Sequence, residues 1–305
     1  MVCVNDILAY LNEKGIKAHY NGTEELKIKG FSSLSEIKDD TVTWMRKYEE
    51  SYKELALSGH NVLLITVQEA KKYLEGCNII ITDRPKMCFF EIVKRFFPEE
   101  KKEEISQNSV IKTNKIGKNV TVGDYCSIGK DVVIGDCVVI KNHVQIEGPV
   151  IIEDHCTIFA GVVIGSDGFG YYRDIDGNNA QVPHTGGVHI GKYVDIGANT
   201  CIDRGTISDT VIGSYTKIDN LCHIGHNVKI GKNVFIIALS MIGGSAVLED
   251  EVYVAPGAKI MNQIHVGKNA FVGMGAVVVK DVKENDVVAG IPAKVIRKRR
   301  DDDRE

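Results

Sequence analysis

The sequence predicts a mainly β protein, a parallel β-helix preceded by a small α/β domain, and three observations lead to this fold class. Aliphatic residues recur every six positions over most of the chain, glycine often follows them, and the first hundred or so residues lack this period. Short fixed repeats are typical of solenoids, in which each repeat buries its apolar residue by stacking on its neighbours. We therefore expect an α/β domain at 1–105, a β-helix at 106–290 and a charged C-terminal tail at 291–305.

The N-terminal domain begins with a helix, because Ile7, Leu8 and Leu11 fall at helical spacing between Asn5 and Lys14. Asn5 is the expected N-cap. The remaining elements expected here are strands within 26–34, 41–45 and 61–67, a helix at 69–74, a strand at 78–82 and a helix at 87–97. The charged segment PEEKKEEISQN at 98–108 then links this domain to the repeats.

The six-residue repeat runs from Val110 to Ile164 without a miss, restarts at Ile190, and after a phase shift continues from Ile212 to Val278. A helical period of 3.6 loses phase with six within two turns, so an amphipathic helix is excluded. Three repeats would close one triangular coil, which places residues eighteen apart directly above one another. We expect the glycines after the buried positions to serve turns with positive φ.

Two interruptions of the period are candidate functional segments, because insertions in a solenoid commonly carry binding loops. Residues 165–188, which include GSDGFGYYRDIDGNN, are rich in glycine and aromatic residues, and we expect them to form a loop over a ligand cleft. Residues 203–210, DRGTISDT, should form a bulge at a corner. The cysteines in or beside the repeats are expected to be core residues: Cys126, Cys156, Cys201 and Cys222.

Composition narrows the class of protein. With 44% apolar residues, a net charge of -4 and no basic cluster along the repeats, the chain is neither disordered nor suited to a nucleic-acid partner. The first residues, MVCVNDILAYLNEKG, lack the apolar run of an export signal, so we expect none, and we expect no membrane span because no apolar run is long enough. The eight cysteines include no CxxC pair, which favours reduced thiols. We expect a soluble, cytoplasmic protein.

Four segments within the repeats carry a family resemblance: GSDGFG (165–170), IGKYVDIGANTCIDRG (190–205), DTVIG (209–213) and KIDNLCHIGHNVKIG (217–231). With them the chain resembles the UDP-3-O-(3-hydroxyacyl)glucosamine N-acyltransferases of lipid A biosynthesis over residues 1–297. The stretch LKIKGFSSLSEIKDDTVTWM also looks like the uridine-binding domain of that family.

The resemblance implies a left-handed β-helix that works as a homotrimer, with active sites between neighbouring β-helices. It implies transfer of a 3-hydroxyacyl group from acyl carrier protein to the 2-amino group of a UDP-3-O-acylglucosamine. Such a reaction requires neither a metal nor a redox cofactor, and the acyl thioester is a co-substrate.

The resemblance assigns the catalytic base to His226 and the oxyanion donor to the backbone N–H of Gly244. These positions are eighteen residues apart, so stacking of the coils places them on one face. An imidazole with its ordinary pKa near 6.5 can accept the proton of an attacking amine at neutral pH. His223 and His226 form an HxxH pair, but the other ligands of a metal site are missing.

The remaining site residues also follow from the resemblance. Trp44 and Tyr48 are candidates for stacking on the uracil ring, although the segment TWMRKY is shorter than the family pattern. The residues expected to bind the sugar are Asp219, Asn220 and His223, and those expected near the acyl chain are Gln263, His265 and Ala276.

Two other functions stay open. The ending VVAGIPAKVIRKRRDDDRE resembles hexapeptide acetyltransferases that use acetyl-CoA. The protein could therefore be a nucleotide-amino-sugar N-acyltransferase that takes a short acyl-CoA and serves a surface glycan, with the same base at His226. The alternative from another class is a non-catalytic β-helix that acts as an assembly scaffold.

Overall fold

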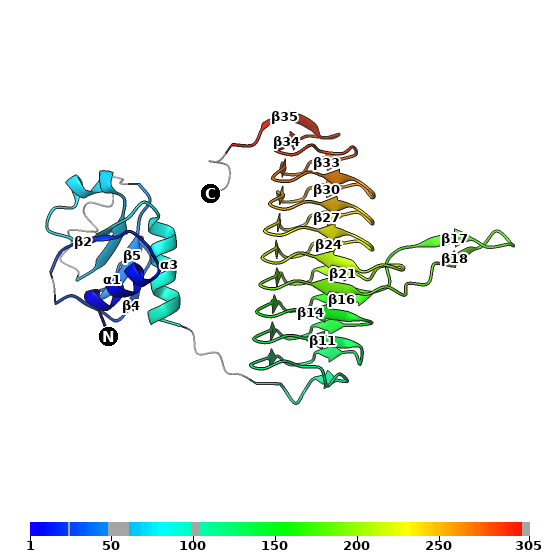
Figure 1. Cartoon of the computed structure of the whole chain (residues 1–305), viewed down its shortest axis with the longest axis horizontal. Coiled ribbons are helices and arrows are strands. Elements are labelled where there is room, and N and C mark those ends of the chain that lie inside the picture. Colours follow the sequence, from blue (N-terminus) through cyan, green and yellow to red (C-terminus); the bar gives the residue numbers. More distant parts are fainter. Residues whose placement is uncertain (24, 48–60, 99–103, 301–305) are drawn as a thin grey trace. The chain divides into compact units, whose positions relative to one another are not determined.

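The computed structural model describes residues 1–23, 25–47, 61–98 and 104–300, and the chain divides into two compact units, Met1–Lys101 and Lys102–Glu305. Figure 1 shows the first unit as a small sheet with helices and the second as a tall stack of coils. Each unit is described by itself below. Among the described residues, none of the helices has the length and apolar composition needed to cross a bilayer.

The first unit is built on a sheet in the order β2-β7-β6-β5-β4, in which β2 alone runs antiparallel to its neighbour. Its elements are β1 (Val2–Cys3), α1 (Val4–Glu13), β2 (His19–Asn21), β3 (Lys27–Ile28), β4 (Gly30–Phe31), β5 (Thr41–Trp44), β6 (Leu63–Thr66), the 3₁₀ helix η1 (Gln68–Tyr73), β7 (Asn78–Ile81) and α3 (Pro85–Phe96). Ile7 and Leu11 of α1 and Ile92 of α3 are fully buried in its core.

Two expectations for this unit are wrong in detail. The N-cap of α1 is Cys3, whose backbone N–H donates to Asp6 Oδ2 at 3.3 Å, and Asn5 lies inside the helix. The segment expected as a helix at 69–74 is the 3₁₀ helix η1, and strand β2 was not expected at all. A short segment of six residues favours the tighter 3₁₀ turn, because few α-helical hydrogen bonds could form in it.

The second unit is a parallel β-helix with three sheets, and within the described residues their strands are as follows. The first sheet holds β8 (Val110–Ile111), β10 (Ser127–Ile128), β13 (Gln145–Ile146), β16 (Val163–Ser166), β21 (Cys201–Asp203), β24 (His223–Ile224), β27 (Met241–Ile242), β30 (Lys259–Ile260) and β33 (Val277–Val278). The second holds β11 (Val132–Ile134), β14 (Val150–Ile152), β19 (Val188–Ile190), β22 (Thr210–Ile212), β25 (Lys229–Ile230), β28 (Val247–Leu248) and β31 (His265–Val266). The third holds β9 (Thr121–Val122), β12 (Val139–Ile140), β15 (Thr157–Ile158), β20 (Asp195–Ile196), β23 (Lys217–Ile218), β26 (Phe235–Ile236), β29 (Tyr253–Val254), β32 (Phe271–Val272), β34 (Asp286–Ala289) and β35 (Lys294–Lys298).

The register confirms the eighteen-residue coil, since Ile224 pairs with Ile242 and Ile242 with Ile260. Both repeat positions, the aliphatic residue and the one two places before it, point into a continuous core. Each buried Ile or Val contributes roughly 1.5–3 kcal/mol of burial free energy. The first coil differs from the expectation, because Ile111 pairs with Ile128 while Val110 is 58% exposed.

The turns correct the expectation about glycine. The residue with positive φ comes three places after the buried aliphatic residue and is often not glycine, as at Asn119, Tyr193 and Asn227. The glycine directly after the buried residue is instead required by close packing between coils. A Cβ on Gly135 would lie 2.8 Å from the backbone nitrogen of Asp154, one coil further on. The six-residue period thus contains two different turn requirements.

The insertion at 165–188 contains a hairpin of β17 (Tyr171–Arg173) and β18 (Asn179–Gln181), which Figure 1 shows extending away from the stack. The rest of the insertion meets the solenoid, since Phe169 lines a cavity at its surface and the His184 ring lies 5.6 Å from that of His226. The expectation of a loop over a cleft therefore holds for the base of the insertion and not for the hairpin. The bulge lies at Gly165, where the register between β16 and β21 shifts, and residues 204–209 form a loop.

The C-terminal segment, expected as a solvated tail, contributes strand β35, which pairs antiparallel with β34. Lys298 of β35 forms an ion pair with the buried carboxylate of Asp286. The guanidinium of Arg299 lies 5.6 Å from the centroid of the Phe271 ring. The pairing of β35 with β34 and these two side-chain contacts therefore give residues 294–299 a defined structure, although their charge predicted a solvated tail.

Candidate active site

A small cavity of about 250 Å³ opens at the corner that follows the first sheet. Its walls come from four successive coils and from the base of the insertion. The lining residues are Phe169, Asp203, His223, Gly225, His226, Gly244, Ser245, Asn262 and Gln263. Stacking of the coils thus gathers polar groups that are up to sixty residues apart in the sequence.

The tautomer of His226 follows from its neighbour Asn227. Asn227 Nδ2 donates to the carbonyl oxygen of Ser208 at 3.1 Å, and this fixes which end of the amide is oxygen. Asn227 Oδ1 lies 2.8 Å from His226 Nδ1, so Nδ1 carries the hydrogen that it donates. In the neutral imidazole, Nε2 is therefore the free base.

Gly244 lies directly against this base, since a Cβ at Gly244 would be 2.8 Å from His226 Nε2. At the other two corners, side chains of neighbouring coils often accept the corresponding backbone N–H. After the second sheet Asp136 accepts that of Lys118 at 2.7 Å, and after the third sheet Asn142 accepts that of Asp124 at 3.0 Å. Within the part of the chain that the structure describes, the Gly244 N–H has no such acceptor. It is available to a ligand oxygen beside the base.

A buried carboxylate with three imidazoles around it borders the cavity. Asp203 is only 7% exposed, and its Oδ2 lies 3.6 Å from His223 Nε2. Burial raises the pKa of Asp203, and the nearby His223, His226 and His184 act in the opposite direction. His184 is itself buried, with its ring edge-on to that of His226 at 5.6 Å.

The matching family description is "Bacterial transferase hexapeptide (six repeats)", which covers residues 115–148 and 209–244. The UDP-3-O-acylglucosamine N-acyltransferase of Campylobacter lari is 35% identical over 281 residues, covering 88% of each chain. That of Campylobacter curvus is 38% identical over 284 residues, covering 90% of this chain and 89% of the relative. The chain belongs to this family of N-acyltransferases.

Solved structures of related sugar acyltransferases share the fold. The UDP-N-acetylglucosamine acyltransferase of Francisella novicida is 28% identical, with a TM-score of 0.56 over 62% of this chain and 68% of that chain. That of Campylobacter jejuni, at 24% identity, has a TM-score of 0.57 over 64% of this chain and 75% of that one. These similarities confirm the prediction of a left-handed parallel β-helix.

The structure brings His223, His226, Gly244 and Gln263 together in the cavity, as the N-acyltransferase family resemblance implied. His265 lies elsewhere, on β31, with its Nε2 3.0 Å from Glu249 Oε1. Ala276 is fully buried in the solenoid core, so the expectation that it lines an acyl groove is wrong. It occupies the inward position two places before Val278, and an inward side chain cannot reach a surface groove.

Asp219 and Asn220 lie at a different corner, after β23, and do not line this cavity. Their side chains join coils: Asn220 Oδ1 accepts the Ala198 N–H at 2.6 Å, and Asp219 Oδ2 accepts the Ala238 N–H at 3.2 Å. Within one chain they are structural residues. Sugar binding by them stays a prediction that requires a neighbouring copy.

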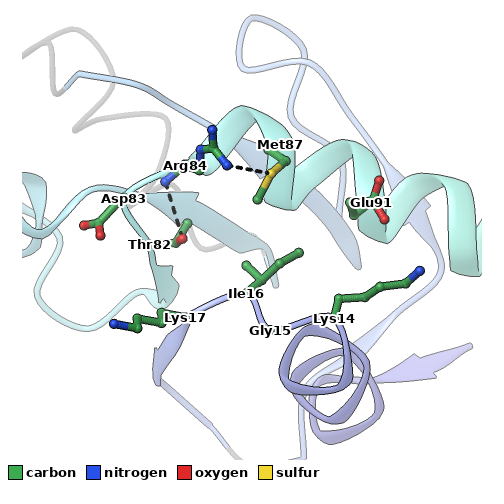
Figure 2. A pocket seen from close by; sticks show the side chains of 9 residues that line it. All are labelled: Lys14, Gly15, Ile16, Lys17, Thr82, Asp83, Arg84, Met87 and Glu91. Atoms are coloured by element: carbon green, nitrogen blue, oxygen red, sulfur yellow. Dashed lines mark hydrogen bonds between the residues drawn. The ribbon is translucent and has the colours of Figure 1, made fainter. Parts of the chain in front are cut away.

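In the first unit, Trp44 packs against Phe89 with ring centroids 6.5 Å apart, and Tyr48 lies outside the described residues. This unit also has a pocket of about 470 Å³. Figure 2 shows its lining residues between the turn after α1 and the start of α3. The pocket is lined by Lys14, Gly15, Ile16, Lys17, Thr82, Asp83, Arg84, Met87 and Glu91, and Trp44 is not among them. Uracil stacking on Trp44 and Tyr48 stays a prediction.

Sequence reasoning missed Asp203, His184 and Asn227 as members of the site. Asp203 and His184 occur in the two interruptions of the repeat, and that location was the available signal. Asn227 occurs in the HNV motif itself but was given no role. Within the described ranges there is no group of three or more His, Cys, Asp or Glu side chains arranged to hold a metal ion.

Proposed function

We propose that the protein transfers a 3-hydroxyacyl group from the thioester of acyl carrier protein to the 2-amino group of a UDP-3-O-acylglucosamine, a step of lipid A biosynthesis. One observation carries this proposal: the His226 nitrogen that acts as the acceptor in the neutral ring and a backbone N–H without an acceptor in the described chain lie side by side in one cavity. The names of relatives that match almost the whole chain support the acceptor.

In the proposed reaction the amine nitrogen attacks the thioester carbonyl carbon. His226 Nε2 takes the proton that the nitrogen loses as the C–N bond forms. General-base assistance of this kind typically accelerates a reaction about 10²- to 10⁴-fold. The Gly244 N–H donates to the oxyanion of the tetrahedral intermediate. When the C–S bond breaks, the imidazolium returns its proton to the departing thiolate, so the products are an amide and a free thiol.

Asn227 has a positioning role in this reaction. Its Oδ1 accepts the Nδ1 hydrogen of His226 and so keeps Nε2 as the base, as the third member of a catalytic triad does. The reaction needs no metal or redox cofactor, and we propose that the enzyme uses none. Gln263, at the far end of the cavity, is the proposed contact for the start of the acyl chain.

We further propose that the working form is a homotrimer in the cytoplasm. The cavity of one chain has only about 250 Å³, and Asp219 and Asn220 lie at another corner, where a second copy could present them to it. Exposed apolar side chains lie along the same corner as Asp219 and Asn220, the corner after the third sheet. Leu221 is 55%, Leu239 62% and Met274 75% exposed. Such a row is typical of surfaces that a partner covers.

A donor competition tests the proposed function. Purified protein is given a UDP-3-O-acylglucosamine or a UDP-amino sugar together with either 3-hydroxyacyl carrier protein or acetyl-CoA, and free thiol release is measured. Turnover with the carrier protein alone supports the proposal, whereas turnover with acetyl-CoA alone supports the surface-glycan N-acyltransferase.

The variant His226→Ala separates both enzymes from a scaffold. Either enzyme should lose acyl transfer almost completely while the protein stays folded and assembled. Two results together would support the scaffold: the wild type transfers no acyl group from any donor, and His226→Ala assembles as the wild type does.

A further inference from the structure

The residues that line the cavity follow one another along the solenoid axis, one coil after the next. Asp203 lies one coil before His226, because Ile202 pairs with Ile224. Gly244 lies one coil after His226, and Gln263 one coil after that. If the acyl chain extends from Gly244 toward Gln263, the acceptor must enter from the side of Asp203. The carboxylate therefore borders the acceptor half of the cavity.

Asp203 is close to the base without bonding to it. A Cβ placed on Gly168 would lie 3.0 Å from His226 Cδ2 and 3.1 Å from Asp203 Oδ2, so both groups lie beside the same glycine. The partner that orients His226 is the neutral amide of Asn227. Asp203 is therefore the carboxylate that lines this cavity, and a positive charge entering it would have Asp203 as its counter-ion.

We propose that Asp203 binds the ammonium form of the acceptor's amino group and so makes this site select an amine over a hydroxyl. The inference rests on the proposed function, since it assumes an amino-sugar acceptor. The ammonium releases one proton to water before the attack, and the second proton passes through His226 to sulfur as described above. The carboxylate then remains beside the imidazolium that forms at His226.

The surroundings of Asp203 fit this role. The titratable side chains that act on Asp203 are His223 from β24, His226 from the turn after β24 and His184 from the end of the insertion. Imidazoles, unlike lysine or arginine side chains, do not give a buried carboxylate a permanent counter-charge. A substrate ammonium would supply this counter-charge, whereas a hydroxyl would leave the carboxylate as it was.

Binding measurements test the proposal without requiring turnover. Calorimetric titrations of the full chain compare UDP-glucosamine with UDP-glucose, which carries a hydroxyl at the same carbon, and use UDP as a reference. The proteins are the wild type, Asp203→Asn and the control Asp136→Asn. Asp136 accepts a backbone N–H at a coil corner remote from the cavity, so its variant removes a carboxylate from the same fold.

The wild type and Asp136→Asn should bind UDP-glucosamine about 10- to 100-fold more tightly than UDP-glucose, the range of one charge-assisted hydrogen bond. Asp203→Asn should bind both sugars within about 3-fold and should bind UDP as the wild type does. A preference that persists in Asp203→Asn, or a wild type without preference, overturns the role of Asp203 but leaves the proposed function standing. A wild type that binds neither sugar also overturns the inference, whereas the proposed function is judged separately by the donor competition with a UDP-3-O-acylglucosamine. Asp203→Ser gives the same comparison if Asp203→Asn does not fold.

Discussion

The contact between Gly244 and His226 provides a sharp test of the site, through the variant Gly244→Ala. The added methyl would lie 2.8 Å from Nε2, 2.9 Å from Cε1 and 3.2 Å from Cδ2 of His226. The imidazole must therefore withdraw by roughly 0.6 Å to reach ordinary van der Waals distance. The backbone of Gly244 is outside the positive-φ region, so alanine brings no backbone strain, and the N–H remains.

Since a misplacement of about 1 Å can cost about 10²-fold in rate, we expect kcat to fall about 10- to 100-fold. The melting temperature should change by no more than about 2 °C, because a side chain at a cavity rim yields at little cost. Single-turnover acyl transfer and calorimetry measure the two effects. His226→Ala should lose more, about 10²- to 10⁴-fold.

Gly129→Ala is the matched control, since its nearest atoms would be Ile146 O at 3.3 Å and Val132 Cγ2 at 3.7 Å, remote from the cavity. It should retain wild-type kcat. If folded Gly244→Ala also retains wild-type kcat, the position of His226 beside Gly244 does not matter for the reaction. The proposed pairing of base and oxyanion donor is then refuted. Equal losses in both variants would indicate general sensitivity of the coils to added methyl groups.

Three further predictions concern single residues. Asn227→Gly, which keeps the positive φ of 61° without strain, should lower kcat at least about 10-fold in the same assay; unchanged kcat would show that Oδ1 does not orient His226. Burial raises the pKa of Cys88 to about 12 and that of Cys156 to about 11, so both should resist iodoacetamide in the native protein at pH 8 and react after denaturation, as mass spectrometry would show. Because burial raises the folded-state pKa of Asp203, its contribution to stability is lost as pH rises through that value, and Asp203→Asn should raise the melting temperature more at pH 7 than at pH 4; parallel curves of melting temperature against pH would contradict this.

The solenoid could be predicted in detail because one physical requirement repeats. Each coil must bury an aliphatic residue on each face, so the period alone located Ile224, Ile242 and Ile260 and their vertical alignment. The turn geometry could not be read in the same way. Glycine is both conformationally free and small, and the sequence does not distinguish these two properties. At the position directly after the buried residue, the small size of glycine is what matters. The positive φ is adopted two residues later, by residues such as Asn227 and Tyr193.

The candidate site was predictable only in part, for a related reason. His226 and Gly244 belong to the regular repeat, so their spacing alone predicts that they lie on one face. Ala276 was misplaced because a shift of one or two positions turns a side chain from the groove into the core. Asp203 and His184 come from segments where the period fails, and only the three-dimensional fold shows that both irregular segments end beside His226.

The corner of the proposed active site differs from regular corners in the side chains that the neighbouring coils place there. A regular corner satisfies its own backbone, as where Asp136 and Asp250 accept N–H groups of the preceding coil. Where such an acceptor is present, that N–H is not available to a substrate. At the corner of the proposed active site the equivalent positions are occupied by His226, Gly244 and Asn262, and no carboxylate or amide of the described chain accepts the Gly244 N–H. Gly244 is partly exposed in the cavity, so its N–H can meet a ligand oxygen there, as the donor to an oxyanion must.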